Sequence, residues 1–176
     1  MEGRAIYVTI RWYQCIIGII NVYAPNSSTN RAHFWRQLAD GLPIADAWIL
    51  AGDFNMTLYK EDKVGGMQMV VQGAELVAWD LLMGRMGVKD AWHVIKKPRS
   101  SLSFSRAGCS MNGFCMSRID RIYISSELEK FGTDVEIIAS STYSDHMPVK
   151  ITLVRQRRPT RDSIVGSTEM FLRTRR

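Results

Sequence analysis

The sequence has few of the features that mark membrane, secreted or disulfide-rich proteins. Its three cysteines are Cys15, Cys109 and Cys115. They form no CxxC pair, which excludes a disulfide framework and argues against a close-set zinc site. The longest apolar run, residues 15–22, is broken by Gly18 and Asn21 and is far shorter than the roughly 20 residues of a membrane-spanning helix. Residues 1–10 lack the pattern of a secretion signal. We therefore expect an intracellular protein of the nucleus or cytoplasm, neither secreted nor bound to a membrane.

The composition is that of an ordinary globular domain, with 46% hydrophobic and 23% charged residues among 176. The net charge is +6, and part of it comes from the segment 155–176. Seven arginines of this segment face two acids: Arg155, Arg157, Arg158, Arg161, Arg173, Arg175 and Arg176 against Asp162 and Glu169. We expect one domain at residues 1–154 and a basic tail at 155–176 that is a linker or disordered. The charge is compatible with a polyanionic partner.

Apolar patterning predicts a mixture of strands and helices in irregular order. Strands are expected at residues 5–10, 14–23, 47–51, 119–124, 135–139 and 148–154. Helices are expected at residues 31–42, 73–86 and 126–131, and loops at residues 59–66 and 99–117. His93 is expected in a further loop beside Trp92. The hairpin-like pairs and the irregular order indicate an α/β or α+β layered fold and exclude a strict βαβ winding.

Three segments carry residues suited to hydrolysis. Asp53 and Asn55 follow a buried strand that ends at Gly52, Asp120 lies on the strand 119–124, and Asp145 adjoins His146 ahead of the last strand. Cleavage of a phosphodiester needs a cation, a base for water and a hydrogen-bonded imidazole or amide for the anionic transition state. Each segment also has a simpler interpretation. Residues 53–55 suit a plain turn, and Asp120 could pair with Arg118 or Arg121 on the sheet surface. A His next to an Asp, as at residues 145–146, is also frequent in ordinary loops.

Four motifs together resemble one known superfamily. They are residues 21–26 (NVYAPN), 52–55 (GDFN), 117–122 (SRIDRI) and 144–149 (SDHMPV). Their order and spacing are similar to those of the endonuclease/exonuclease/phosphatase superfamily, and most similar to the apurinic-type endonuclease domains of plant non-LTR retrotransposons. The resemblance covers residues 4–154. It implies a four-layer α-β-β-α sandwich with two mixed sheets, a divalent cation (Mg²⁺ or Mn²⁺) and hydrolysis of phosphodiester bonds in DNA.

The resemblance also implies roles for the residues on the first strands. Tyr23 matches a phosphate-contacting tyrosine of the family. Asp53 matches an acid that orients the water or assists the leaving group, and Asn55 matches a phosphate-binding amide. DNA would be bound through its phosphate backbone. A complementary chain, or the reverse-transcriptase region of a parent element, is a further partner that the resemblance suggests.

The remaining roles fall on the last two motifs. Asp120 matches the acid that orients the histidine, and His146 matches the phosphate-binding histidine. Asp145 matches a carboxylate on the metal side of the site. Whether Asp53 or His146 is the general base stays open at this stage.

One departure from the family pattern concerns the metal. In the family an Asn and the principal metal-binding Glu precede the segment that matches residues 21–26. Here twenty residues precede Asn21, and Glu2 lies ahead of the first strand. We therefore expect a domain truncated at its N-terminus, an incomplete metal site and an exposed apolar face or edge of a sheet.

Three functions fit these observations. The first is metal-dependent hydrolysis of DNA, impaired by the missing metal ligands. The second is a nucleic-acid-binding remnant of a retrotransposon that does not cut. The third is a phosphatase of the same superfamily that acts on a small phosphoester. The basic tail and the SRIDRI motif favour DNA over the small substrate.

Overall fold

The structure is a computed structural model, and it describes residues 3–65, 70–96, 104–110, 113–138 and 144–154. The predicted basic tail at residues 155–176 lies outside the described residues. The division of the chain into a domain at 1–154 and a tail therefore stays a prediction.

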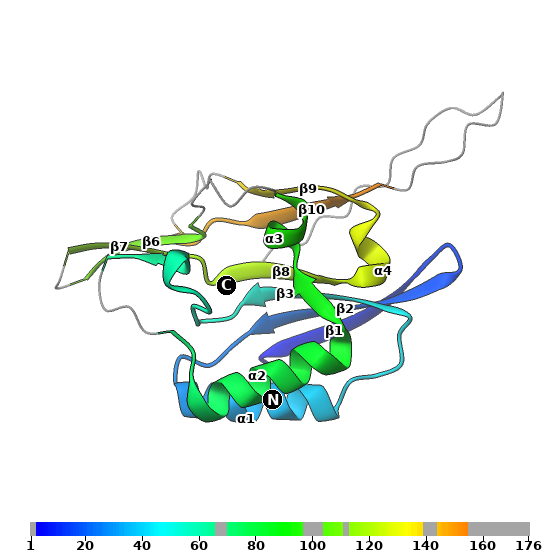
Figure 1. The fold of residues 1–176 in the computed structure, drawn as a ribbon, viewed down its shortest axis with the longest axis horizontal. Coiled ribbons are helices and arrows are strands. Elements are labelled where there is room, and N and C mark those ends of the chain that lie inside the picture. The colour runs from blue at the N-terminus through cyan, green and yellow to red at the C-terminus, as the bar shows by residue number, and fades with distance from the viewer. Residues whose placement is uncertain (1–2, 66–69, 97–103, 111–112, 139–143, 155–176) are drawn as a thin grey trace.

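A five-stranded mixed sheet forms the centre of the molecule (Figure 1). Its strands, in spatial order, are β1 (Ala5–Trp12), β2 (Cys15–Tyr23), β3 (Ala47–Asp53), β8 (Asp120–Ser125) and β5 (Val88–Asp90). β2 and β3 are parallel, and the other neighbours are antiparallel. The predicted hairpin of the first two strands is confirmed, and its turn at residues 13–14 leaves Tyr13 with a φ of 56°.

Two helices cover one face of this sheet. α1 (Ser28–Asp40) begins after Ser27, whose hydroxyl accepts a hydrogen bond from the backbone N–H of Asn30. α2 (Gly73–Met86) packs against α1, and Arg31 forms a buried ion pair with Glu75 between them. The largest buried apolar cluster fills the space between these helices and the sheet. Its aromatic side chains are Phe34, Trp35, Trp48, Phe54, Trp79 and Tyr123.

A two-stranded antiparallel sheet covers the opposite face. It consists of β9 (Gly132–Ile137) and β10 (Val149–Leu153), and the short helix α4 (Ser126–Glu129) leads into it. A second apolar cluster lies between the sheets. It includes Ile17, Ile49, Ile122, Ile124, Val135, Ile151 and Leu153. The predicted α/β sandwich is thus confirmed, with helices on one side of the central sheet and the second sheet on the other (Figure 1).

Two predicted loops contain regular structure instead. The expected loop at 59–66 holds the 3₁₀ turn η1 (Lys60–Asp62) and β4 (Lys63–Val64). The expected loop at 99–117 holds the hairpin of β6 (Arg106–Ser110) and β7 (Gly113–Ser117), which joins β4 in a three-stranded sheet. These strands are short and rich in polar residues and glycine, so they lack the apolar alternation that predicts a strand. His93 was predicted in a loop but lies in the short helix α3 (Ala91–Ile95).

The outer strand β1 exposes apolar side chains. Ile6 is 64% exposed and Val8 is 49% exposed. They lie on the same face of β1 as Ile10, which packs against the cluster between the sheets. An apolar face on an outer strand is thus exposed, as predicted, and it favours association with other chains. In the described part of the chain, no helix has the length and hydropathy needed to cross a membrane.

Candidate active site

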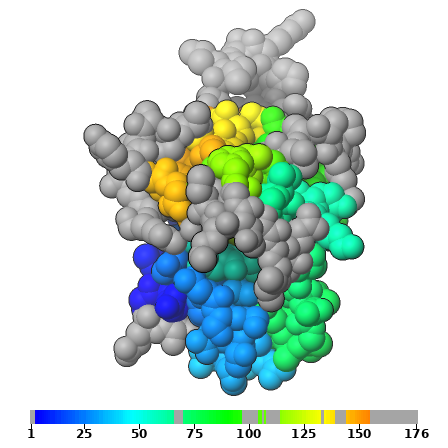
Figure 2. All heavy atoms as spheres, turned by 90° about the vertical axis from the view of Figure 1, so that its left-hand side faces the viewer, coloured from blue at the N-terminus to red at the C-terminus, as the bar shows by residue number. Residues whose placement is uncertain are grey.

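Three strands bring polar residues to one end of the central sheet. Tyr23 on β2 stands opposite Asp53 on β3, and Asp53 stands opposite Asp120 on β8. Residues in register on adjacent strands point to the same face, here the face toward β9 and β10. Gly52 makes the close approach possible, because its φ is 137° and a Cβ there would lie 2.0 Å from the carbonyl oxygen of Val22. Figure 2 shows this end of the molecule, with α1 and α2 below and the second sheet above.

His146 joins this row from the segment that precedes β10. Its Nδ1 lies 2.8 Å from Oδ2 of Asp120, which is buried. An ionised carboxylate only accepts hydrogen bonds, so Nδ1 carries the hydrogen and donates it. The hydrogen bond to Asp120 raises the pKa of His146, burial lowers it, and the charges of Asp120, Asp53 and Asp145 raise it, with a net increase. The imidazole is therefore fixed in orientation and holds a proton at higher pH than an ordinary histidine.

Asp53, Asp120 and His146 form one compact group. One ligand atom from each lies within 4.8 Å of the other two, and both acids are buried. Oδ1 of Asp120 and Nε2 of His146 are buried without a hydrogen-bond partner in the described part of the chain. Buried polar atoms of this kind are costly unless a ligand or water completes them. The two carboxylates suit a hard cation such as Mg²⁺ or Mn²⁺, while an imidazole nitrogen suits a phosphate oxygen better than it suits Mg²⁺.

Asn55 and Tyr23 lie next to this group. Asn55 has a φ of 49°, a conformation that Asn tolerates better than most residues. Its backbone N–H donates to Oδ1 of Asp53 at 2.9 Å, and its side-chain amide donates to the carbonyl of Ala24 at 2.8 Å. Tyr23 is 37% exposed. The turn interpretation of residues 53–55 is thus correct in geometry, and the same turn places Asn55 beside the acids.

Asp145 is placed differently from the other acids. It is exposed, and it is outside the group of three potential ligands that the described residues form. Its backbone carbonyl accepts a hydrogen bond from Ala107 at 3.2 Å. The assignment of Asp145 as a metal ligand stays a prediction that follows from the resemblance.

One residue of the row was missed in the sequence. Arg4 precedes β1, and its carbonyl accepts a hydrogen bond from the backbone N–H of Tyr23 at 2.8 Å. Its guanidinium lies 5.4 Å from the centre of the Tyr23 ring, within the range of a cation–π contact. Arg4 therefore extends the row of Tyr23, Asp53 and Asp120 by one strand. The pairing register of β1 and β2 is the signal that identifies it, and a sequence shows no register.

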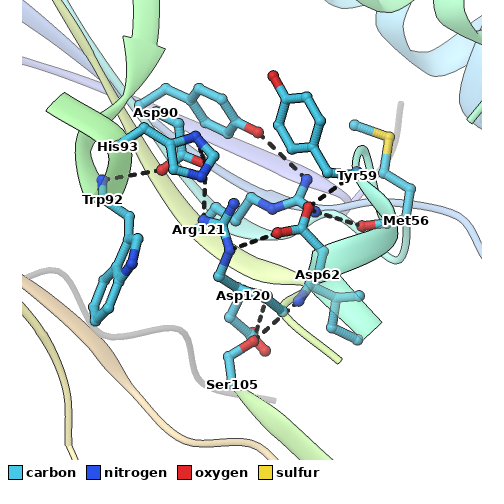
Figure 3. Close-up of polar contacts among 12 residues, drawn as sticks. Met56, Tyr59, Asp62, Asp90, Trp92, His93, Ser105, Asp120 and Arg121 are labelled. Atoms are coloured by element: carbon cyan, nitrogen blue, oxygen red, sulfur yellow. Dashed lines mark hydrogen bonds and ion pairs between the residues drawn. The ribbon is translucent and has the colours of Figure 1, made fainter. Parts of the chain in front are cut away.

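A network of buried ion pairs lies behind Asp120, and we call it the arginine network (Figure 3). Asp62 accepts hydrogen bonds from Nε of Arg118 and from Nη2 of Arg121, both at 2.9 Å. Asp90 accepts one from Nη1 of Arg118 at 2.8 Å. Burial opposes the charge of Arg118, but Asp90 and Asp62 outweigh it and raise the pKa of Arg118 above its ordinary value.

The arginine network corrects one alternative drawn from the sequence. Asp120 was considered as a surface partner of Arg118 or Arg121. In the structure Asp120 is buried and pairs with His146, while the two arginines pair with Asp62 and Asp90. Alternation along β8 explains this, because Asp120 and Arg121 point to opposite faces of the sheet.

Comparison with known proteins gives both sequence and structural relatives. No protein-family model matches the sequence. A protein described as the transposon TX1 uncharacterized 149 kDa protein of Xenopus laevis is 29% identical over 156 residues, which is 87% of this chain and 12% of that protein. The chain thus corresponds to a small part of a much longer relative.

Solved structures share the fold. The catalytic domain of Xenopus laevis APE2 superposes with a TM-score of 0.66 and 22% identity, over 86% of this chain and 55% of that one. The endonuclease domain of TRAS1, a telomere-specific non-LTR retrotransposon, superposes with a TM-score of 0.55 and 13% identity, over 82% of this chain and 60% of that one. This chain therefore has the endonuclease/exonuclease/phosphatase fold and spans little more than half the length of these neighbours.

Proposed function

We propose that this chain, which has the endonuclease/exonuclease/phosphatase fold, is the part of a DNA endonuclease that carries its acid–histidine group and hydrolyses phosphodiester bonds with a divalent cation. The observation that carries the proposal is the compact group of Asp53, Asp120 and His146. Its ligand atoms lie within 4.8 Å of one another at the end of three adjacent strands. Turns on a protein surface do not need two buried acids beside a half-buried imidazole.

The chemistry follows from the donors and acceptors of the group. Nδ1 of His146 is held by Asp120, so Nε2 is the nitrogen that can meet a phosphate oxygen. The raised pKa of His146 favours the protonated ring, which donates from Nε2 to the negative charge that develops on the phosphate. Asp53 then orients the attacking water by accepting its hydrogen bond, or assists the departing oxygen. The general base is one of Asp53 and His146, and the pH-rate profiles of their variants distinguish them.

A divalent cation fits the carboxylates of this group. Asp53 and Asp120 would hold Mg²⁺ or Mn²⁺, with Asp145 as the further carboxylate that we propose from the resemblance. When bound, the cation supplies positive charge to the non-bridging oxygens of the phosphate. The like charges of two buried carboxylates also favour a bound cation, because the cation removes their mutual repulsion.

The substrate class is supported by two independent features. Arg4 and Tyr23 add a cation and a phenol beside the acids, and the chain carries a net charge of +6. Cations of this kind bind the phosphate backbone of nucleic acids. The similar proteins include a transposon protein and an endonuclease domain of a non-LTR retrotransposon. We therefore propose DNA as the substrate and a retrotransposon as the origin of the chain.

The test is nicking of supercoiled plasmid DNA by the purified chain, with Mg²⁺, with Mn²⁺ and with a chelator. We expect nicking that requires the cation and falls by a factor of about 10² to 10⁴ in His146→Ala. His33→Ala is the matched control, because His33 is exposed on α1, away from the row. Circular dichroism and thermal unfolding verify that each variant is folded.

Three other results would overturn the proposal in different ways. Salt-sensitive DNA binding without nicking by the folded chain would indicate a binding remnant. Release of phosphate from a small phosphoester without DNA cleavage would indicate a phosphatase. Nicking that survives in both Asp53→Ala and His146→Ala would place the chemistry elsewhere in the chain.

A further inference from the structure

Ser105 lies between the two segments that supply Asp120 and His146. It is fully buried, with an exposed fraction of 0%. Its Oγ accepts hydrogen bonds from the backbone N–H of Ile119 at 3.0 Å and from that of Asp120 at 2.8 Å (Figure 3). One hydroxyl therefore holds both amides at the point where β8 begins. A serine hydroxyl has two acceptor lone pairs, so this arrangement uses its full accepting capacity.

The backbone of Ser105 contacts the other segment. Its carbonyl accepts a hydrogen bond from the backbone N–H of Met147 at 2.7 Å, and Ala107 donates to the carbonyl of Asp145 at 3.2 Å. Residues 105 and 107 thus hold the residues on both sides of His146. The N–H of Ser105 also donates to the carbonyl of Ser117 at 3.1 Å, which ties Ser105 to the strand ahead of Asp120.

We propose that Ser105 is a positioning residue, which sets the distance and orientation of His146 relative to Asp120 by holding the backbone of both segments. It does not touch the reacting atoms in this role. The effect of Ser105 on catalysis rests on the proposed function, since Ser105 supports the same acid–histidine pair. The geometry that carries the proposal is independent of catalysis.

The pairing of His146 with Asp120 depends on fixed geometry. The hydrogen bond between Nδ1 and Oδ2 is 2.8 Å long, and such a bond weakens steeply when either partner shifts or tilts. Asp120 is the first residue of β8, and His146 lies in an irregular segment ahead of β10. Residues in these places are held less firmly than residues within a sheet. A buried residue that is bonded to both removes this freedom, as support around an active site must.

The experiment compares Ser105→Ala with Ser125→Ala in the full chain. Ser125 lies at the other end of β8, is equally buried, and its hydroxyl accepts a hydrogen bond from the backbone N–H of Trp48 at 2.9 Å. Both variants remove a buried hydroxyl that serves backbone amides of this sheet. Only Ser105→Ala removes one that adjoins the acid–histidine pair.

The readouts are hydrogen exchange of backbone amides and the NMR signal of the ring hydrogen on Nδ1 of His146, both at one fixed pH. In Ser105→Ala we expect the amides of Ile119 and Asp120 to exchange about tenfold faster or more, since each buried donor has lost the hydroxyl that accepts its hydrogen bond. The amide of Met147 keeps the backbone carbonyl of residue 105 as its partner. We expect the ring hydrogen signal to broaden or disappear. Ser125→Ala should leave the amides of Ile119 and Asp120 and the ring hydrogen unchanged.

Two results would overturn the proposal. One is a folded Ser105→Ala variant in which the amides of Ile119 and Asp120 and the ring hydrogen behave as in the original chain. The other is an equal loss of both signals in Ser125→Ala, which would show a general effect of stability. If Ser105→Ala does not fold, Ser105→Cys takes its place, because sulfur keeps the shape and accepts hydrogen bonds weakly. It should give the same changes at smaller size, and original behaviour in this variant would also reject the proposal.

Plasmid nicking separates this proposal from the proposed function. If the chain nicks DNA, Ser105→Ala should lower kcat more than it changes KM, because misplacing a fixed group affects the transition state and leaves DNA binding intact. If the chain does not nick DNA, the exchange and ring-hydrogen results still decide whether Ser105 positions the pair.

Discussion

Two neighbouring residues of β8, Asp120 and Arg121, point into two buried polar regions that differ in their hydrogen bonding. Arg121 points into the arginine network, where both oxygens of Asp62 and both oxygens of Asp90 accept hydrogen bonds. Asp120 points into the candidate site. There Oδ1 of Asp120 and Nε2 of His146 have no partner among the residues that the structure describes. Both regions are buried and charged, so burial alone does not separate them.

The two regions differ in how many of their carboxylate oxygens accept hydrogen bonds. In the arginine network, Nη2 of Arg118 and Nε of Arg121 lack a partner within the described ranges, but both oxygens of each acid accept hydrogen bonds. This is the pattern of a structural ion pair, which holds elements together. At the site an acid and an imidazole keep open atoms on the same side of the sheet, at a cost in stability. A buried carboxylate with an open oxygen beside a held histidine is thus the better sign of function.

The largest effect is expected from breaking the arginine network. Asp62→Ala leaves Arg118 and Arg121 buried without their shared acid, and we expect it to lower the free energy of unfolding by about 3–5 kcal/mol. Urea denaturation followed by tryptophan fluorescence measures this change, because Trp35 and Trp79 are buried. Asp40→Ala breaks the exposed pair with Arg85 and serves as the control, with an expected loss below about 1 kcal/mol. Equal losses in the free energy of unfolding of the two variants would show that the arginine network stabilises the fold no more than an exposed ion pair does.

The next effect concerns the pH dependence that His146 adds. Its pKa is raised in the folded state, chiefly by the hydrogen bond to Asp120. The stabilisation is complete below the pKa of an unfolded histidine, about 6.5, and is lost as the pH rises through the folded pKa. Asp120→Asn should lower the pKa of His146, which NMR titration of the ring measures. The decline in stability as the pH rises above about 6.5 should then shrink. An unchanged pKa would show that Asp120 does not hold the imidazole in solution.

The smallest effect on stability is expected at the site itself. Asp53→Asn keeps an oxygen that can accept the N–H of Asn55 and removes a negative charge near Asp120. The free energy of unfolding should change by no more than about 1 kcal/mol, while nicking falls sharply, as is common for residues kept for activity. Urea denaturation tests the expected stability, and the plasmid assay tests the expected loss of nicking. If Asp53→Asn lowered the free energy of unfolding as much as Asp62→Ala, Asp53 would have a structural role. The candidate site and the arginine network would then not differ in function.

Local signals predicted the long elements well. The helix expected at 73–86 matches α2 at both ends, because its apolar residues recur at helical spacing and Gly87 adopts the left-handed conformation that ends it. The strands β5, β6 and β7 were missed. β5 has only three residues, β6 pairs with β7, and β7 also pairs with β4. Pairing of this kind leaves no periodic pattern in the sequence.

The sequence named candidate residues for the site but not their arrangement. The candidates were Tyr23, Asp53, Asn55, Asp120, Asp145 and His146. The structure brings ligand atoms of Asp53, Asp120 and His146 within 4.8 Å of one another, and the role of each residue stays a prediction. The partners of Arg118 and Arg121 were beyond reach, because Asp62 is distant in the sequence and lies in a segment expected to be a loop. The contribution of Ser105 also depends on contacts across three segments, which no local pattern encodes.

The strand order of the central sheet has a consequence for synthesis. β8 lies between β3 and β5, so the second neighbour of β3 is synthesised only after α1, α2 and β5. Until residues 120–125 emerge, β3 has an open edge, and His146 follows later still. The group of Asp53, Asp120 and His146 therefore cannot assemble on a nascent chain that stops before residue 146. During translation of this region, apolar strands are therefore exposed without their pairing partners. Chaperones act on states of this kind.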